Sequence, residues 1–167
     1  MKKIIVLMAV IAISMTKTTF AQSKTDAAFN QLLTAYYDVK NALAADKQDV
    51  AKDKANALVS KVDAIPHKEL PAAQHMLWME QSKIIKAKAG ELAAGKDIKA
   101  QRKSFETLSS AMIKTVRNIK FNNATVYVQH CPMAKASWLN EKENIENPYY
   151  GSMMFDCGDV SETIKSK

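Results

Sequence analysis

The sequence predicts a mainly α-helical fold: a four-helix up-down bundle followed by an irregular C-terminal segment that contains a short β-hairpin. Three observations predict it. Four stretches within residues 24–120 repeat apolar residues at three- and four-residue steps, which is the spacing of one helix face. Short polar connections separate these stretches, and such connections favour antiparallel neighbours. After residue 120 the helical period stops, and β-branched, aromatic and turn-forming residues replace it.

The first two helices are defined by regular apolar stripes with charged residues between them. Asp46 stands where it can cap the second helix, because an aspartate side chain accepts hydrogen bonds from the free amides at a helix start. Pro66 ends that helix, since proline cannot continue the backbone hydrogen bonds. The two stripes consist of Phe29, Leu32, Tyr36, Val39 and Leu43, and then of Ala51, Ala55, Leu58, Val62 and Ile65.

The third and fourth helices follow the same rule. Pro71 marks the start of the third helix. Gly95 ends it and Asp97 caps the fourth, so the two helices are joined by a tight turn. The two stripes consist of Leu77, Trp78, Ile84, Ile85 and Leu92, and then of Ile98, Phe105, Leu108, Met112, Val116 and Ile119.

The segment after the bundle differs in composition from the helices. A pair of asparagines breaks the fourth helix, and residues 126–128 are β-branched and aromatic, which predicts a short strand. We expect residues 137–140 to form a turn of helix. Residues 153–155 are expected to form a second short strand, which completes the hairpin.

The N-terminal residues 1–21 predict a signal peptide. A cationic start precedes an apolar run over residues 4–13, and a small-residue cleavage site follows. That run is shorter than the ~20 apolar residues that a membrane-spanning helix requires. We therefore expect a periplasmic or secreted protein with no membrane insertion after signal cleavage. Residues 22–167 would form a single domain, with the bundle at 24–120 and the cysteine- and methionine-bearing segment at 121–160.

The positive charge of the chain is spread along its helices. Loss of Lys2, Lys3 and Lys17 with the signal peptide lowers the formal charge from +7 to +4. Arg102 and Arg117 are the only arginines, whereas nucleic-acid-binding surfaces are rich in arginine and interleaved aromatic residues. We expect a solvated surface and no nucleic-acid partner.

Both cysteines of the chain, Cys131 and Cys157, lie in the C-terminal segment. In an oxidising compartment they can form a disulfide that pins the tail. They can equally serve as two thiolate ligands of one metal ion. The spacing alone does not separate these two interpretations.

Soft sulfur groups gather around the cysteines in the sequence. Met133 lies two residues after Cys131, and Met153 and Met154 shortly precede Cys157. Thiolate and thioether sulfur bind Cu(I) strongly, so copper(I) is the expected ion if the two segments pair. Methionine also fills gaps beside aromatic rings, which is the alternative interpretation of Met153 and Met154.

The histidines add candidate ligands. His130 is next to Cys131, and in a strand the two side chains point to opposite faces, so a shared site requires a turn of the backbone. His75 and Met79 are one helical turn apart and can hold a metal or support the tail site, although a histidine at an apolar edge more often only hydrogen-bonds. His67 is expected to be exposed in its loop.

Catalytic motifs are absent from the sequence. It contains no HExxH, GxSxG, CxxCH or glycine-rich phosphate loop. A thiol oxidoreductase would place a CxxC pair at a helix start to lower one thiol pKa, and here Cys131-Pro132-Met133 stands instead. Zinc is disfavoured because two cysteines and one well-placed histidine leave its fourth position open. We expect a protein that is not an enzyme.

These features resemble a known family, the domain of unknown function 3347, and the resemblance extends over essentially the whole chain after the signal peptide. Members are exported proteins of Bacteroidetes that stand alone or form the C-terminal domain of periplasmic adaptor proteins in copper/silver efflux systems. Many relatives lack a methionine at the position of Met153. The matching elements are residues 97–102 with Phe105, Leu108 and Ser109; residues 126–128 leading into 131–134; Trp138 and Leu139; residues 147–149 with Gly151; and residues 154–158.

The resemblance implies a heavy-metal context, and two functions are expected from the residues and the resemblance together. The first is a periplasmic Cu(I)/Ag(I)-binding protein, a buffer or a donor to an efflux adaptor or another periplasmic protein, in which Trp138 and Tyr149 close the site against water. The second is a non-enzymatic interaction module without metal, stapled by a Cys131–Cys157 disulfide. For the metal-binding function, the expected ligands are Cys131, Met133, Met154 and Cys157, with His130, His75, Met79 and Met153 as further candidates.

Overall fold

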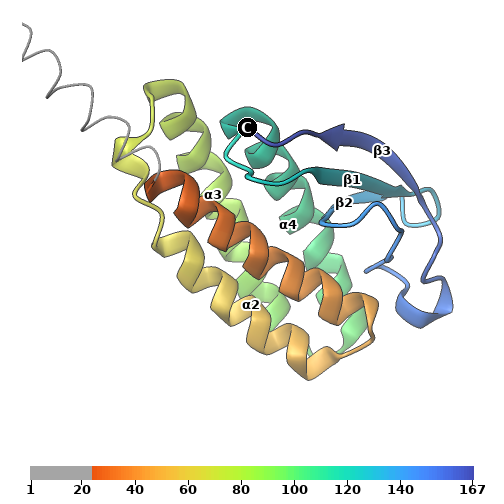
Figure 1. The fold of residues 1–167 in the computed structure, drawn as a ribbon. Helices are drawn as coiled ribbons and strands as arrows, with labels where there is room; N and C mark the ends of the chain where they lie inside the picture. Colours follow the sequence, from red (N-terminus) through yellow and green to blue (C-terminus); the bar gives the residue numbers. More distant parts are fainter. Residues whose placement is uncertain (1–23) are drawn as a thin grey trace, which may run out of the picture.

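The protein is described by a computed structural model of residues 24–167, shown in Figure 1. The expected signal peptide, residues 1–21, lies outside the described residues. The helices are the N-terminal helix (residues 24–44), α2 (Gln48–Asp63), the 3-10 turn η1 (His67–Glu69), α3 (Ala72–Ala93) and α4 (Ile98–Ile119). They are followed by β1 (Val126–Cys131), β2 (Ala136–Asn140), the 3-10 turn η2 (Gly151–Met153) and β3 (Asp159–Ile164).

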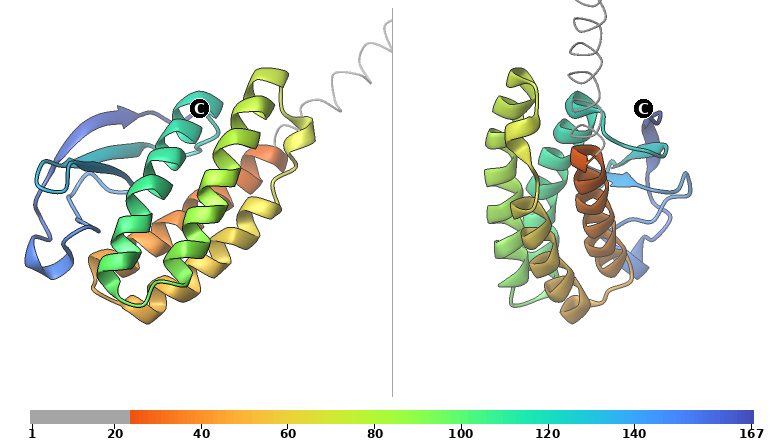
Figure 2. Two further views of the ribbon diagram at one scale, coloured as in Figure 1. Left: turned by 180° about the vertical axis from the view of Figure 1, so that it is seen from behind. Right: turned by 60° about the vertical axis from the view of Figure 1, so that its left-hand side comes forward.

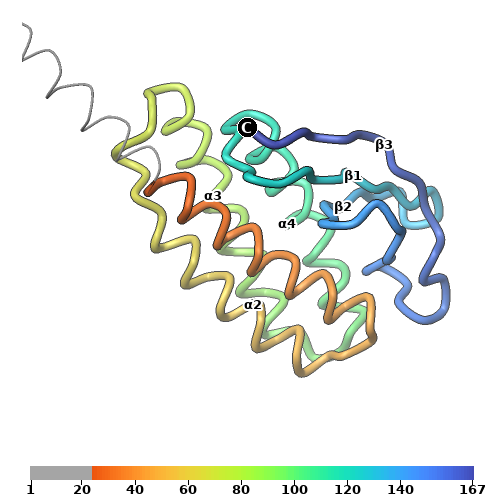
Figure 3. Tube along the Cα trace, in the orientation of Figure 1, coloured from red at the N-terminus to blue at the C-terminus, as the bar shows by residue number. Residues whose placement is uncertain are grey.

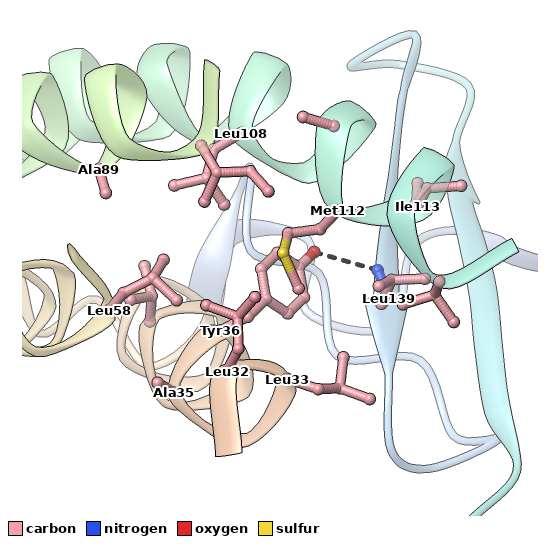
Figure 4. Close-up of a cluster of buried hydrophobic side chains, with 14 of the residues drawn as sticks. Leu32, Leu33, Ala35, Tyr36, Leu58, Ala89, Leu108, Met112, Ile113 and Leu139 are labelled. Carbon is pink, nitrogen blue, oxygen red and sulfur yellow. Dashed lines mark hydrogen bonds between the residues drawn. The ribbon is translucent and has the colours of Figure 1, made fainter. Parts of the chain in front are cut away.

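The four predicted helices are confirmed, and their apolar stripes meet in one core. Leu58 and Leu108 come from α2 and α4, and Tyr36 of the N-terminal helix lies beside Met112 in the close-up of Figure 4. Phe29 stacks on Phe121 with ring centroids 4.6 Å apart. Met112, expected in the core, is fully buried.

The helix caps agree with the sequence at one turn and differ at another. Asp97 caps α4 as predicted, because its carboxylate accepts a 2.7 Å hydrogen bond from the Ala100 amide. The prediction that Asp46 caps α2 is wrong, since Lys47 occupies that position without a side-chain cap. The Asp46 carboxylate instead forms an ion pair with Arg102, so a tertiary contact replaces the local one.

The C-terminal segment forms a three-stranded antiparallel sheet in the order β2-β1-β3. The strand predicted at residues 126–128 is confirmed, and it extends to Cys131. The helical turn predicted at residues 137–140 is wrong, because these residues pair with β1 across the 132–135 turn, with Ser137 opposite His130. The strand predicted at residues 153–155 is also wrong: this stretch overlaps η2 and the third strand is β3, which runs back so that the C-terminus lies beside the end of α4 (Figure 3).

The sheet lies against one side of the bundle, as both views of Figure 2 show. Two tyrosines form hydrogen bonds with backbone groups on the outer edge of β2, which no strand of residues 24–167 covers. The Tyr36 hydroxyl accepts a 3.1 Å hydrogen bond from the Leu139 amide (dashed in Figure 4), and the Tyr149 hydroxyl donates to the Ser137 carbonyl at 2.7 Å. Because unpaired edge groups are costly when buried, these bonds fix the sheet on the helices.

Residues 141–147 fold back over the face of the sheet that carries Gln129. The Gln129 amide donates to the carbonyl groups of residues 142, 143 and 144 at 2.9–3.1 Å. Asn140 joins the same network through its own amide, which donates to Gln129 at 2.9 Å. The sheet is thus enclosed between the bundle and its own connecting loop, which buries the face on which Cys131 lies.

Candidate functional site

The structure brings the two cysteines together. Cys131 ends β1 and is fully buried, whereas Cys157 lies just before β3 and is half-buried. Antiparallel pairing of β1 with β3 sets His130 opposite Asp159, which brings Cys131 near Gly158 and the neighbouring Cys157. The two thiols are close enough to interact electrostatically, and both are free.

The Cys157 thiol is protonated at neutral pH. Partial burial raises the pKa of the Cys157 thiol, and the neighbouring Cys131 sulfur raises it further. The Cys131 sulfur in turn accepts a 3.4 Å hydrogen bond from the Ala134 amide. A thiol with a raised pKa is a weak nucleophile at neutral pH, and a soft cation that displaces its proton is a better partner than an electrophilic substrate.

The segment that carries Cys157 is held by the Asn147-Pro148-Tyr149 sequence. The Asn147 side chain donates to the Cys157 carbonyl at 2.8 Å and accepts from the Tyr149 amide at 2.8 Å. The Asn147 amide also donates to the Phe155 carbonyl at 2.8 Å. One buried asparagine therefore fixes both ends of the loop, which explains why an Asn-Pro-Tyr turn accompanies the second cysteine.

Two aromatic rings, those of Trp138 and Tyr149, pack against each other near the cysteines. Both are buried, and their rings meet edge to face with centroids 5.8 Å apart. Gly158 makes the close approach possible: its φ is +142°, and an added Cβ would lie 2.7 Å from the His130 carbonyl oxygen and 3.1 Å from the Trp138 ring. Any side chain at Gly158 would push Cys157 away from β1.

The methionines divide into two groups. Met133 and Met153 are 64% and 73% exposed, and both line an open groove of about 750 Å³ together with Ile98 at the start of α4. Met154 is half-buried, and its carbonyl accepts a 3.1 Å hydrogen bond from the Cys157 amide. Met154 and Cys157 therefore belong to the same hydrogen-bonded turn.

His130, His75 and Met79 are not brought to the cysteines. His130 lies on the opposite face of β1 from Cys131, as strand geometry requires, and its Nδ1 is 3.0 Å from the Ser137 hydroxyl. His75 and Met79 belong to α3, whose first turn lies on the far side of the bundle from the β1–β2 turn in Figures 1 and 2. Within residues 24–167, no three His, Cys, Asp or Glu side chains are grouped to hold a metal ion.

Two charged residues that hold the segment in place were missed by the sequence analysis. Lys40 was expected in the solvated surface but is fully buried, and its ammonium donates to Asn140 at 2.8 Å and to Glu146 at 2.9 Å. A signal was present, because Lys40 is one helical turn after Tyr36 and therefore lies on the apolar face.

Arg102 is the second missed residue. Its guanidinium donates to the carbonyl groups of Leu43 and Pro148, each at 2.9 Å, and pairs with Asp46. Asp46 also accepts a 2.9 Å hydrogen bond from the Ser152 amide. The C-terminal segment is therefore fastened to α4 and to the turn before α2 by one arginine–aspartate pair, and no local sequence pattern reveals it.

The family resemblance is confirmed by direct comparison. The model of the family described as a protein of unknown function, DUF3347, matches residues 32–124. The chain belongs to this family. The matched region covers most of the bundle and stops before both cysteines, so the family match alone assigns no role to them. No curated protein and no solved structure matches the chain. Over residues 24–167, none of the helices has the length and apolar character needed to cross a membrane.

Proposed function

We propose that this DUF3347 protein binds a thiophilic monovalent ion, Cu(I) or Ag(I), through Cys131 and Cys157. It would act in the periplasm or outside the cell as a buffer or as a donor to an efflux system, without catalysing a reaction. The observation that carries the proposal is the proximity of the two thiols, which the pairing of β1 with β3 brings near each other.

The chemistry of the donors supports a soft ion. Two neighbouring thiols supply thiolate ligands, and Met154 adds a thioether within the same loop. Zinc requires four ligands of the Cys, His or carboxylate type, and the described residues do not group three of them. Sulfur donors in small number satisfy Cu(I) and Ag(I), so the residues present fit these ions.

The surroundings of the thiols also favour a protected ion. Trp138 and Tyr149 are buried against the site and exclude water on one side. Met133 lies two residues beyond Cys131 and is exposed in the groove, where it can transfer an ion between solvent or a partner and the thiols. In this proposal Met133 passes the ion to the thiols, and Met154 helps to hold it there.

The decisive experiment is anaerobic titration of the purified protein with Cu(I) in competition with a chromogenic chelator, after a free-thiol assay. We expect two free thiols and a one-equivalent endpoint. Cys157→Ser should abolish competition, and Met154→Leu should weaken it, because each removes a sulfur donor but leaves similar volume. Met76→Leu is the matched control, since Met76 is 73% exposed on α3, far from the cysteines.

A protein with two free thiols that fails to compete for Cu(I) would refute the proposal. So would competition that Met76→Leu weakens as much as Met154→Leu, because the ion would then be bound by surface thioethers.

A second function is favoured by the groove beside the site. Ile98, Met133, Tyr150 and Met153 give this groove of about 750 Å³ an apolar surface suited to a partner protein. In that function Cys131 and Cys157 form a disulfide that closes a loop of about 25 residues, which contributes about 3 kcal/mol in the chain-entropy model. A free-thiol assay that finds no thiols until a reductant is added would support this interaction module and exclude the metal site.

A further inference from the structure

A second pair of metal-ligating side chains lies on the other side of the molecule. His67 in η1 and His75 in the first turn of α3 face each other, with Nδ1 of His67 3.2 Å from Nε2 of His75. Their ring centroids are 5.3 Å apart and the rings are tilted by 41°. The expectation that His67 is solvent-exposed is wrong: both histidines are half-buried.

The separation of the two nitrogens fits one shared metal ion. Metal–imidazole bonds of about 2.0–2.1 Å place two ligand nitrogens about 2.9 Å apart at a right angle and about 3.4 Å apart at the tetrahedral angle. The observed 3.2 Å lies between these limits. A small outward rotation of the rings is therefore all that an ion needs to replace the hydrogen bond between them.

The backbone holds both rings ready for this arrangement. The His67 amide donates to the Ile65 carbonyl at 2.8 Å, and the His75 amide donates to the Pro71 carbonyl at 2.8 Å. Buried Ile65 anchors the chain just before η1. Because both ligands sit on hydrogen-bonded turns, little conformational freedom is lost when an ion binds.

The side chain available as a third ligand, Met79, favours copper among the divalent ions. Met79 follows His75 by one helical turn on the same face of α3 and is 37% exposed. Imidazole nitrogen binds Cu(II) more tightly than the other divalent first-row ions, and a thioether adds to this preference.

We propose that His67 and His75, with Met79 beside them, form a surface site for a divalent transition-metal ion, with Cu(II) the tightest and Zn(II) weaker. This site is independent of the cysteine pair and does not rest on its proposed function.

The test uses the Cys131→Ser/Cys157→Ser protein, so that thiols neither bind nor reduce the added Cu(II). We expect one equivalent of Cu(II) to bind, with imidazole nitrogen coupling in its electron paramagnetic resonance spectrum. His67→Asn and His75→Gln place an amide nitrogen near the ligating ring nitrogen, which keeps a hydrogen bond and removes the metal ligand. Each should weaken Cu(II) binding by about tenfold or more. His130→Gln is the matched control and should bind as the parent does.

Equal affinity in the parent and in both variants would overturn the site, as would an equal loss in His130→Gln. A second measurement applies if the double serine variant does not fold. Zn(II) added to the unmodified protein should shift the ring resonances of His67 and His75 in its nuclear magnetic resonance spectrum and leave those of His130 unchanged. Unshifted rings of His67 and His75 at saturating Zn(II) would also overturn the proposal.

Discussion

Among single residues, Lys40 connects the helical bundle to the end of β2 and to the loop that follows it. It is fully buried, and its ammonium contacts Asn140, Glu146 and, at 3.4 Å, Glu141. Lys40→Met keeps the side-chain volume but leaves the carboxylates without their cation, and removal of one partner of a buried ion pair costs about 3 kcal/mol. We expect a loss of about that size in the free energy of unfolding, measured by urea denaturation.

The control for this substitution is Lys54→Met. Lys54 pairs with Asp38 on the surface, where the two side chains are 43% and 46% exposed. Exposed pairs contribute little, so the change should stay within about 0.5 kcal/mol. Equal effects of the two substitutions would show that Lys40 is not the special contact described above.

Glycine gives a second prediction at this scale. Gly151 has a φ of +56°, and an added Cβ would collide with the Asp46 carboxylate and the Arg102 guanidinium. Gly90 lies inside α3 with nothing within 4 Å of its added Cβ. Gly151→Ala should therefore destabilise the protein by about 2 kcal/mol or more, since both strain and a broken ion pair contribute. Gly90→Ala should stabilise it by about 0.5–1 kcal/mol, because alanine favours a helix.

Thermal denaturation of the two alanine variants measures both effects. The opposite signs are the informative result. If Gly151→Ala leaves the midpoint unchanged, the arginine–aspartate pair does not occupy the space assigned to it.

At the scale of elements, the helices could be predicted and two of the strands could not. A helix is predicted from the local spacing of its apolar residues, such as Ile98, Phe105 and Leu108. The helix α4 lies where that spacing predicts it. The pairing of β2 with β1 depends on contacts made across a turn and on the hydroxyl of Tyr36 from another helix. Such distant contacts leave no local pattern in residues 136–140.

The third strand illustrates a different limit. β3 is an edge strand with alternating half-buried and exposed residues, and charged groups such as Asp159 and Glu162 hide its apolar positions. Edge strands often carry charge to avoid pairing with other chains. The sequence of β3, considered without its neighbours, is therefore typical of a loop.

The turn between the N-terminal helix and α2 is coupled to α4 through Asp46, and this coupling depends on pH. Hydrogen bonds from Ser152, and then the Arg102 guanidinium, lower the pKa of Asp46 from 3.8 to about 2. A carboxyl with a lowered folded-state pKa stabilises the fold above its unfolded-state pKa, and the stabilisation is lost as the pH falls through the folded-state value. The window for Asp46 is therefore between about pH 4 and pH 2.

Asp46→Asn tests this coupling. The variant should be less stable than the parent at neutral pH by up to about 1 kcal/mol, a modest value because solvent screens a partly exposed pair. The difference should shrink as the pH approaches 2, since the parent carboxyl becomes protonated there. Urea denaturation at a series of pH values measures it, and a difference that does not change with pH would contradict the assignment.

At the scale of the whole molecule, the bundle serves as a scaffold for the segment that holds the cysteines. Lys40 and Arg102 lie in the region matched to the family, and both reach into residues 140–148 of the C-terminal segment. The sequence analysis expected Cys131 near Cys157, but through pairing with residues 153–155, whereas β3 after Cys157 is the strand that pairs with β1. Sequence patterns could not place His67 beside His75, because that contact depends on how η1 turns into α3.

The proposed ion would link the end of β1, which carries Cys131, to the segment before β3, which carries Cys157. Binding should therefore raise the stability of the folded protein. An ion that binds only the folded state at a concentration about a hundred times its dissociation constant stabilises it by about 2.7 kcal/mol. For a chain of this length that corresponds to an increase of about 5–10 °C in the unfolding midpoint. Ag(I) is the suitable probe, since it does not require a reductant.

We expect Ag(I) to raise the unfolding midpoint of the parent and of Met76→Leu equally, and to leave that of Cys157→Ser unchanged. Cys157 is the better position for the substitution, because it is half-buried and its replacement disturbs the core less than replacement of the fully buried Cys131. A similar increase in Cys157→Ser would mean that Ag(I) acts at another site. No increase in the parent, with both thiols shown to be free, would mean that the proximity of the cysteines does not serve to bind a soft ion.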